Sequence, residues 1–211
     1  MHITVYAASS GQIPEPYVRE AAALGRLLAT EGHTLVNGAG RTGLMGACTD
    51  ACLAAGGRAV GVIPQFMVEQ NWQHKGMTEL CVTPDMHSRK ERMASMSDAC
   101  IALPGGVGTL EELLEVITWK QLGIYLKPIV VLNADGYFNP LLQQLQRAVD
   151  ERFMRPEHWQ IWRTARTAAE ADPAAAYLPD KAALEEAAAH RNIGGLILDA
   201  EAGTVYYANP G

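Results

Sequence analysis

Short apolar segments alternate with helical patterns along most of this sequence, which predicts an α/β fold. Strands are expected at residues 3–8, 33–38, 58–64, 79–83, 99–104, 127–133 and 159–165. Helices are expected at residues 14–32, 43–57, 85–98 and 137–153, and in the part of 102–119 that follows its glycines. The strands are apolar on both faces, as in a parallel sheet that helices cover on both sides. We therefore expect a doubly wound, mostly parallel, Rossmann-like sheet with an irregular loop at 64–75.

The chain is expected to divide into a Rossmann-like domain at residues 1–172 and a C-terminal extension at residues 173–211. Residues 168–190 are rich in alanine and follow a helical pattern, and two strand-like segments flank a turn at 201–203. The two strand-like segments carry too much apolar content for a solvated tail. We expect the extension to form a helix and a hairpin that pack on the core or on a partner subunit.

Composition limits the classes of function. Hydrophobic residues make up 48% of the 211 residues, which allows a sizeable core. The net charge of −6 gives no general attraction to nucleic acid or to an anionic membrane. No apolar run approaches the ~20 residues of a membrane span, and the N-terminus lacks the pattern of a secretory signal. Because the four cysteines also form no C-x-x-C pair, we expect a cytoplasmic protein.

The segment ALPGGVGTLEELLEVITW, residues 102–119, combines a glycine turn with acidic residues. Gly105, Gly106 and Gly108 lie between an expected strand and an expected helix. Ligands of open parallel sheets bind beyond the carboxyl ends of the strands, and glycine N–H groups at a helix N-terminus favour an anion. Thr109 adds a hydroxyl group. The glycines alone are equally compatible with a tight strand-to-helix turn.

Two charged residues are expected to lie within apolar helix faces. Glu112 shares a helix side with Val116 and Trp119, whereas Glu111 points toward the polar side. In the segment DMHSRKERMASMSD, Arg89 shares a face with three methionines. An unpaired buried guanidinium is costly, so an anion or a carboxylate must meet Arg89. The alternatives are a solvated glutamate at the edge of its stripe and a purely structural ion pair for the arginine.

The segment NGAGRTGLMG contains the spacing G-x-G-x-x-G at Gly38, Gly40 and Gly43. This spacing invites a dinucleotide-binding interpretation. Two features oppose it, because the glycines follow the second strand rather than the first, and the next strand ends in proline instead of the acid that holds ribose hydroxyls. We expect a second turn that faces a phosphate or a ribose, with Ser9 after the first strand as its hydroxyl-bearing partner.

Taken together, MHSRK and PGGVGTLEELLEVITW resemble the Lonely Guy family of cytokinin-type nucleotide phosphoribohydrolases, whose members are often mislabelled lysine decarboxylases. The segment GAGRTGLMG is similar to the family's glycine turn, with Ala39 where glycine is usual, and GVIP and NADGYFNPLL also fit. The resemblance covers roughly residues 2–170. The family usually has a glutamate where this sequence has Asn71, so the base preference stays open.

The resemblance implies hydrolysis of the N-glycosidic bond of a nucleoside 5′-monophosphate, either AMP or a cytokinin riboside 5′-monophosphate, to a free base and ribose 5-phosphate. It implies that Arg89 and Glu112 are the catalytic pair. With the turns described above, the expected substrate-binding residues are Ser9, Gly40, Lys90, Gly105, Gly106, Gly108, Thr109, Glu111 and Thr118. No step requires a metal or an organic cofactor, and we expect a homodimer.

The chemistry of the residues agrees with this reaction. Cleavage builds positive charge on the ribose ring, which Glu112 can stabilise while it orients or activates water. Its place early in a helix is expected to favour the ionised carboxylate. Arg89 can hold the phosphate or a ribose-facing carboxylate.

Three alternatives are considered. A non-catalytic nucleotide or cofactor carrier of the same fold explains the glycines but not the pairing of Arg89 with Glu112. A nicotinamide-dependent oxidoreductase is opposed by the missing ribose acid. A pyridoxal-dependent lysine decarboxylase is opposed because no lysine has the context of a Schiff base.

Overall fold

A computed structural model describes residues 1–172, 196–199 and 204–207. The chain divides into two compact units, Met1–Pro173 and Ala174–Gly211. The strands of the first unit are β1 (His2–Tyr6), β2 (Thr34–Asn37), β3 (Arg58–Pro64), β4 (Glu79–Thr83), β5 (Ala99–Ala102), β6 (Ile129–Leu132) and β7 (Arg163–Ala165). Its α-helices are α1 (Glu15–Thr30), α2 (Gly43–Ala54), α3 (Gln65–Glu69), α4 (Met86–Met96), α5 (Val107–Gln121) and α6 (Asn139–Asp150). Its 3₁₀ helices are η1 (Ala134–Gly136), η2 (Pro156–Ile161) and η3 (Ala168–Ala171).

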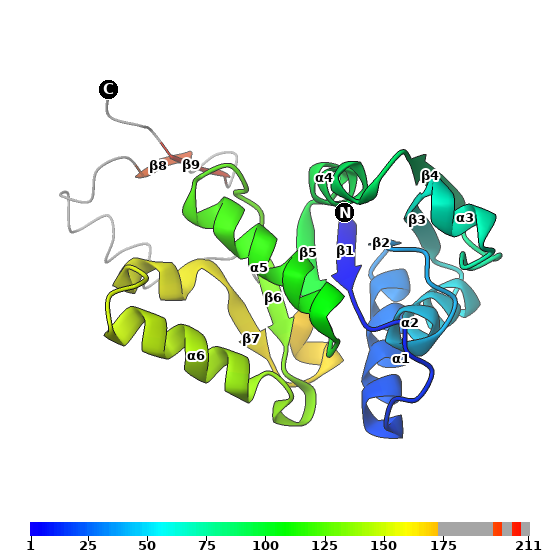
Figure 1. Cartoon of the computed structure of the whole chain (residues 1–211), viewed down its shortest axis with the longest axis horizontal. Coiled ribbons are helices and arrows are strands. Elements are labelled where there is room, and N and C mark those ends of the chain that lie inside the picture. Colours follow the sequence, from blue (N-terminus) through cyan, green and yellow to red (C-terminus); the bar gives the residue numbers. More distant parts are fainter. Residues whose placement is uncertain (173–195, 200–203, 208–211) are drawn as a thin grey trace. The chain divides into compact units, whose positions relative to one another are not determined.

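The seven strands of the first unit form one sheet in the order β4-β3-β2-β1-β5-β6-β7, and every neighbouring pair is parallel. This confirms the predicted doubly wound fold (Figure 1). The chain runs from β1 outward to β4 and then returns to β5, so the strand order reverses between β1 and β5. At this reversal the carboxyl ends are level, because Tyr6 is paired with Ala102. Such a reversal opens a crevice at the carboxyl edge of the sheet.

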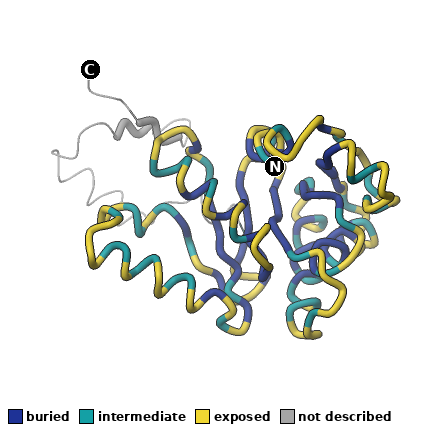
Figure 2. Tube along the Cα trace, viewed as in Figure 1, coloured by how far each residue is buried: buried dark blue, intermediate teal, exposed yellow. Residues whose placement is uncertain are grey.

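The central strands of the sheet are buried (Figure 2). On one face, buried side chains of α4 and α5 join those of the central strands in a cluster that includes Met93, Leu113, Val116 and Phe138. On the other face, α1 packs against α2 and η3. The helices that carry the predicted catalytic pair are therefore held by the main core.

Two local expectations need correction. The segment 64–75 is not wholly irregular, because Gln65–Glu69 forms the short helix α3. The strand β4 is not covered on both faces, since Leu80 and Val82 remain 36% and 47% exposed. The reason is that β4 is an edge strand of the sheet.

The second unit contains β8 (Leu196–Asp199) and β9 (Thr204–Tyr207), which pair antiparallel and agree with the expected hairpin strands. The helix expected before them lies outside the described residues. In the part of the chain that is described, no helix has the length and apolar character needed to cross a membrane.

Gly25 allows α1 and α2 to approach closely. A Cβ atom at this position would lie 2.1 Å from the carbonyl oxygen of Cys48. We predict that Gly25→Ala lowers the free energy of unfolding by about 1–3 kcal/mol, the usual cost of overpacking, although alanine is the better helix former. Thermal unfolding measures the effect. Gly11→Ala is the control, because a Cβ there meets no atom within 4 Å. Equal melting temperatures for the two variants would contradict the prediction.

Candidate functional site

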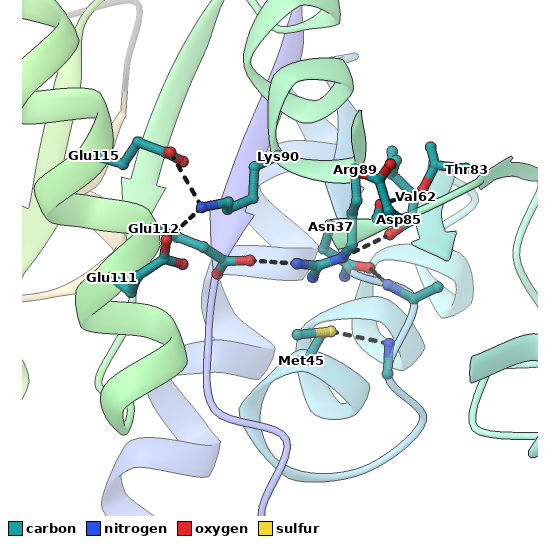
Figure 3. A network of polar contacts seen from close by, with 12 residues as sticks. Asn37, Met45, Val62, Thr83, Asp85, Arg89, Lys90, Glu111, Glu112 and Glu115 are labelled. Atoms are coloured by element: carbon teal, nitrogen blue, oxygen red, sulfur yellow. Dashed lines mark hydrogen bonds and ion pairs between the residues drawn. The ribbon is translucent and has the colours of Figure 1, made fainter. Parts of the chain in front are cut away.

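Arg89 and Glu112 form a buried ion pair between α4 and α5 (Figure 3). The Nη1 atom of Arg89 donates to Oε1 of Glu112 at 2.7 Å, and the two side chains are only 8% and 9% exposed. The Nε atom of Arg89 donates to the carbonyl oxygen of Val62 at 3.1 Å. This confirms that a carboxylate meets the arginine in its apolar stripe. The guanidinium is thus fixed from two sides beside the carboxyl end of β3.

The glycine motif between β2 and α2 is explained largely by packing. A Cβ atom at Gly38 would lie 2.0 Å from Nη2 of Arg89, so only glycine leaves room for the guanidinium. Gly43 has a φ of +66°, and a Cβ there would lie 2.5 Å from the carbonyl oxygen of Ser10. The turn therefore fits closely around Arg89 and against the loop after β1. In Figure 3 it lies next to Met45, whose sulfur accepts the N–H of Gly40.

The carboxyl group of Glu112 lies in an environment that opposes its charge. Burial raises the pKa of Glu112 above its ordinary value of 4.5, and the charge of Arg89 counteracts this only in part. Glu112 is the sixth residue of α5, beyond the first turn, where the helix dipole is weak. The expectation that helix position would favour the ionised form is therefore outweighed by burial. Burial also raises the pKa of Tyr6, and the negative charge of Glu112 adds to that effect.

Lys90 lies beside this pair and contacts two other acids. Its Nζ atom forms ion pairs with Glu111 and, at 3.1 Å, with Glu115. Burial alone would lower the pKa of Lys90, but the hydrogen bonds that its ammonium donates to the two glutamates outweigh this effect, and the pKa is raised. Figure 3 shows the five charged side chains of this region, which come from the facing helices α4 and α5: Arg89, Lys90, Glu111, Glu112 and Glu115.

The turn that follows β5 presents open backbone at the start of α5. Gly106 is the N-cap residue, and no side chain caps the helix. A Cβ atom at Gly106 or Gly108 would meet no atom within 4 Å, whereas a Cβ at Gly105 would collide with the hydroxyl of Thr109. The first two glycines of the motif therefore differ in role. Gly105 leaves room for the side chain of Thr109, whereas Gly106 leaves the N-terminus of α5 accessible.

A cavity of about 330 Å³ lies beside Arg89 at the carboxyl ends of β1, β2 and β3. It brings together three predicted site residues, Ser9, Gly40 and Arg89. Gly38, a member of the glycine turn that was expected to face a ligand, also lines it. Sequence reasoning missed the remaining lining residues, which are Arg41, Thr42, Met45, Ile63, Met67 and Trp72. A signal for Trp72 was available, since it is a large aromatic residue within a polar loop.

Thr118 does not reach this cavity. It lies on the exposed side of α5, where its hydroxyl donates to the carbonyl oxygen of Leu114 at 2.7 Å. There it borders a separate open hollow together with Val107, Leu110, Glu111, Leu114 and Glu115. Predicted site residues thus lie on two different surfaces, with Ser9, Gly40 and Arg89 in the cavity and Glu111 and Thr118 at the open hollow.

Comparison with known proteins gives consistent results. Residues 45–174 match the family described as "Possible lysine decarboxylase". The chain is 44% identical over 168 residues to the cytokinin riboside 5′-monophosphate phosphoribohydrolase LOG5 of Arabidopsis thaliana, across 80% of this chain and 74% of that protein. It is 45% identical over 155 residues to the cytokinin riboside 5′-monophosphate phosphoribohydrolase of Rhodococcoides fascians, across 73% of this chain and 78% of that protein.

Solved structures with the same fold include two proteins linked to molybdenum cofactor. One is the molybdenum cofactor carrier protein MCP from Chlamydomonas reinhardtii, with a TM-score of 0.64, 23% identity, and coverage of 83% of this chain and 94% of that chain. The other is the molybdenum cofactor binding protein from Rippkaea orientalis, with a TM-score of 0.58, 24% identity, and coverage of 80% and 90%. At these identities the likeness concerns the fold alone.

The buried pair should show strong energetic coupling. Removing one partner leaves the other buried and unpaired, so Arg89→Met or Glu112→Leu alone is expected to cost about 3–5 kcal/mol of unfolding free energy. The double variant should recover much of that loss, because both charges are then absent. Urea unfolding of the four proteins measures the coupling.

The exposed pair of Arg147 and Glu151 is the matched control for this cycle. Their side chains are 69% and 48% exposed, so their coupling should stay below about 1 kcal/mol. Additive losses at Arg89 and Glu112 would show that the two residues do not depend on one another.

Proposed function

Because this chain belongs to the Lonely Guy (LOG) family of phosphoribohydrolases, we propose that it hydrolyses the N-glycosidic bond of a nucleoside 5′-monophosphate. The products are a free base and ribose 5-phosphate, and the substrate is AMP or a cytokinin riboside 5′-monophosphate. The observation that carries the proposal is the buried pair of Arg89 and Glu112, which lies next to the strand-order reversal where α/β sheets bind ligands.

Glu112 is proposed to stabilise the positive charge that develops on the ribose ring as the bond breaks. Its second carboxylate oxygen is then available to orient the attacking water, while Oε1 accepts from Arg89. Burial strengthens this electrostatic interaction because little solvent screens it. Arg89 keeps the carboxylate oriented and opposes the rise of its pKa. Because Glu112 would stabilise charge and Arg89 would orient Glu112, the reaction needs both charged residues here, and two apolar residues could not replace them.

The 5′-phosphate is proposed to bind at the open N-terminus of α5. Gly106 and Gly108 allow the substrate to approach the backbone, and the uncapped N–H groups of a fifteen-residue helix favour an anion. Since the protein as a whole carries a net charge of −6, anion attraction must come from such local groups. A phosphate at Gly106 would place the attached ribose toward Glu112, which lies six residues further along the chain in the same helix.

Two other activities are less well supported. A carrier of the same fold would need the glycine turns but not a desolvated carboxylate beside an arginine. A pyridoxal-type decarboxylase would need a neutral lysine amine, whereas Lys90, the lysine beside the pair, has a raised pKa and contacts Glu111 and Glu115.

Glu112→Gln keeps the size of the side chain but removes its charge. We predict that turnover of AMP falls by roughly 10²–10⁴, as for other positioned electrostatic or acid–base groups, while AMP binding weakens much less. Adenine release, followed by chromatography, measures turnover, and calorimetry measures binding. Because burial raises the pKa of Glu112, wild-type kcat/KM should fall on the acid side at a pH above 4.5.

Glu111→Gln is the matched control, because Glu111 is adjacent in sequence but half-exposed and paired with Lys90. Its effect on turnover should be mild. Adenosine serves as the control substrate, since it lacks the phosphate and should be cleaved far more slowly. Near-normal turnover in Glu112→Gln would remove this residue from catalysis.

We also propose that the protein acts as a homodimer in the reducing cytoplasm. All four cysteines are free, although Cys48 and Cys52 lie one helical turn apart. The segment that follows α5 exposes Leu122, Ile124 and Leu126 at 68%, 70% and 61%. A second copy covering this surface would also approach the face of α5 that carries Thr118.

Ile124→Asp should disrupt this dimer. Ile124 and Leu126 border a groove of about 540 Å³ between α4 and α5, so a charge there would be buried on association. We predict a dimeric mass for the wild type at micromolar concentration and dissociation at least about ten-fold easier for the variant, as for other central interface residues. Light scattering across a dilution series measures both. Phe153→Asp, at an 82% exposed residue outside this groove, is the control. A monomeric wild-type mass would contradict the proposal.

A further inference from the structure

The cavity beside Arg89 has two chemically different sides. One side carries the guanidinium groups of Arg41 and Arg89 and the hydroxyl groups of Ser9 and Thr42. The other is apolar and includes Ile63, Met67 and Trp72. A ligand that fits both sides has a polar part joined to a flat apolar part. The ribose and base of a nucleotide have this composition, and the cavity volume of about 330 Å³ lies at the lower end of the range for small-molecule sites.

Trp72 is the most exposed large aromatic residue of this cavity. Half of its surface is accessible, although burial of such a side chain normally stabilises a protein. Its neighbour in the same segment, Phe66, is exposed to a similar extent, at 47%, but does not line the cavity. The exposure of Trp72 therefore leaves an aromatic surface available at a concave site that it shares with Arg89.

The backbone around Trp72 is fixed on both sides. On the N-terminal side, the N–H of Trp72 donates to the carbonyl oxygen of Met67 at 3.2 Å. Asn71, which follows α3, has a φ of +55°. On the C-terminal side, Gln73 forms an antiparallel bridge with Gly40, and the N–H of His74 donates to the carbonyl oxygen of Ala39 at 2.7 Å. These contacts attach the segment to the glycine turn of the same cavity.

The turn that receives this segment is itself held in place. Ala39 has a φ of +61°, and its N–H donates to the side-chain oxygen of Asn37 at 2.9 Å. The amide nitrogen of Asn37 donates in turn to the hydroxyl of Thr49 at 2.9 Å. The side chain of His74 adds a contact to Asp50 at 2.8 Å. The backbone that carries Trp72 is thus positioned before a ligand arrives, which lowers the entropic cost of binding.

We propose that Trp72 stacks on the nucleobase of the substrate and makes the site selective for purine over pyrimidine nucleotides. This inference rests on the proposed function, since it assigns the base-binding side of the same site. Every base has a π face that can stack on an aromatic side chain, and the larger purine ring gains more from it. The contact acts on substrate affinity and not on the bond that breaks. Trp72 is therefore a specificity-determining residue rather than a catalytic one.

The test measures binding, so that it does not depend on turnover. AMP, CMP and ribose 5-phosphate are titrated by calorimetry into the Glu112→Gln protein, with and without Trp72→Ala. We expect the dissociation constant of AMP to rise about 5- to 150-fold, which corresponds to the loss of one base–aromatic stack. The constant for ribose 5-phosphate should stay within about two-fold, because this ligand has no base. The preference for AMP over CMP should shrink.

Two further variants separate stacking from a structural effect. Trp72→Phe keeps an aromatic ring and should retain most of the AMP affinity. Phe66→Ala, which removes a similarly exposed ring outside the cavity, should leave all three affinities unchanged. Unchanged AMP affinity in Trp72→Ala would overturn the inference, as would an equal loss for AMP and ribose 5-phosphate. If the wild type binds AMP through Trp72 but releases no adenine, the proposed hydrolysis fails while this inference stands.

Discussion

The structure of this site depends on one buried ion pair, formed by Arg89 and Glu112. A guanidinium and a carboxylate can be buried together only where their geometry is good and their remaining polar atoms find partners. Arg89 meets this condition through Glu112 and the carbonyl oxygen of Val62, which ties α4, α5 and β3 to one another. The fold provides the place for it, because α4 leads from the edge strand β4 to β5, α5 leads from β5 to β6, and both helices pack in the same core cluster against the sheet. The same desolvation that makes the pair costly also makes its charge effective on a reacting ribose.

Much of this arrangement could be predicted from the sequence. The alternation of strands and helices, the parallel sheet, and the presence of Arg89 and Glu112 within apolar helix faces all follow from local periodicity, which the residues themselves carry. Their direct contact did not follow from periodicity, because it depends on how two helices distant in sequence pack on one sheet. The resemblance to the LOG family supplied that pairing, and the geometry gives its physical reason.

Other features lay beyond sequence reasoning for identifiable causes. The spacing of Gly38, Gly40 and Gly43 suggests a ligand-binding turn, yet Gly38 mainly makes room for a side chain that comes from another helix. The exposure of β4 depends on its place at the sheet edge, which strand composition alone does not reveal. Trp72 is recognisable as a large aromatic residue in a polar loop, but its place in the cavity is set by backbone contacts between two loops. In each case the decisive information is a contact between distant segments.

The close approach of Arg89 to Gly38 also has a consequence for how sequences of this kind can diverge. The guanidinium occupies the volume where a side chain at position 38 would begin. A side chain at position 38 would therefore displace the guanidinium from its place beside Glu112, whereas loss of the arginine would remove the steric reason for glycine. The two positions should accordingly drift together across descendants of this protein, with glycine at 38 kept as long as the arginine is kept. A descendant in which both Gly38 and Arg89 are substituted would therefore have lost the site, even where the sheet is unchanged.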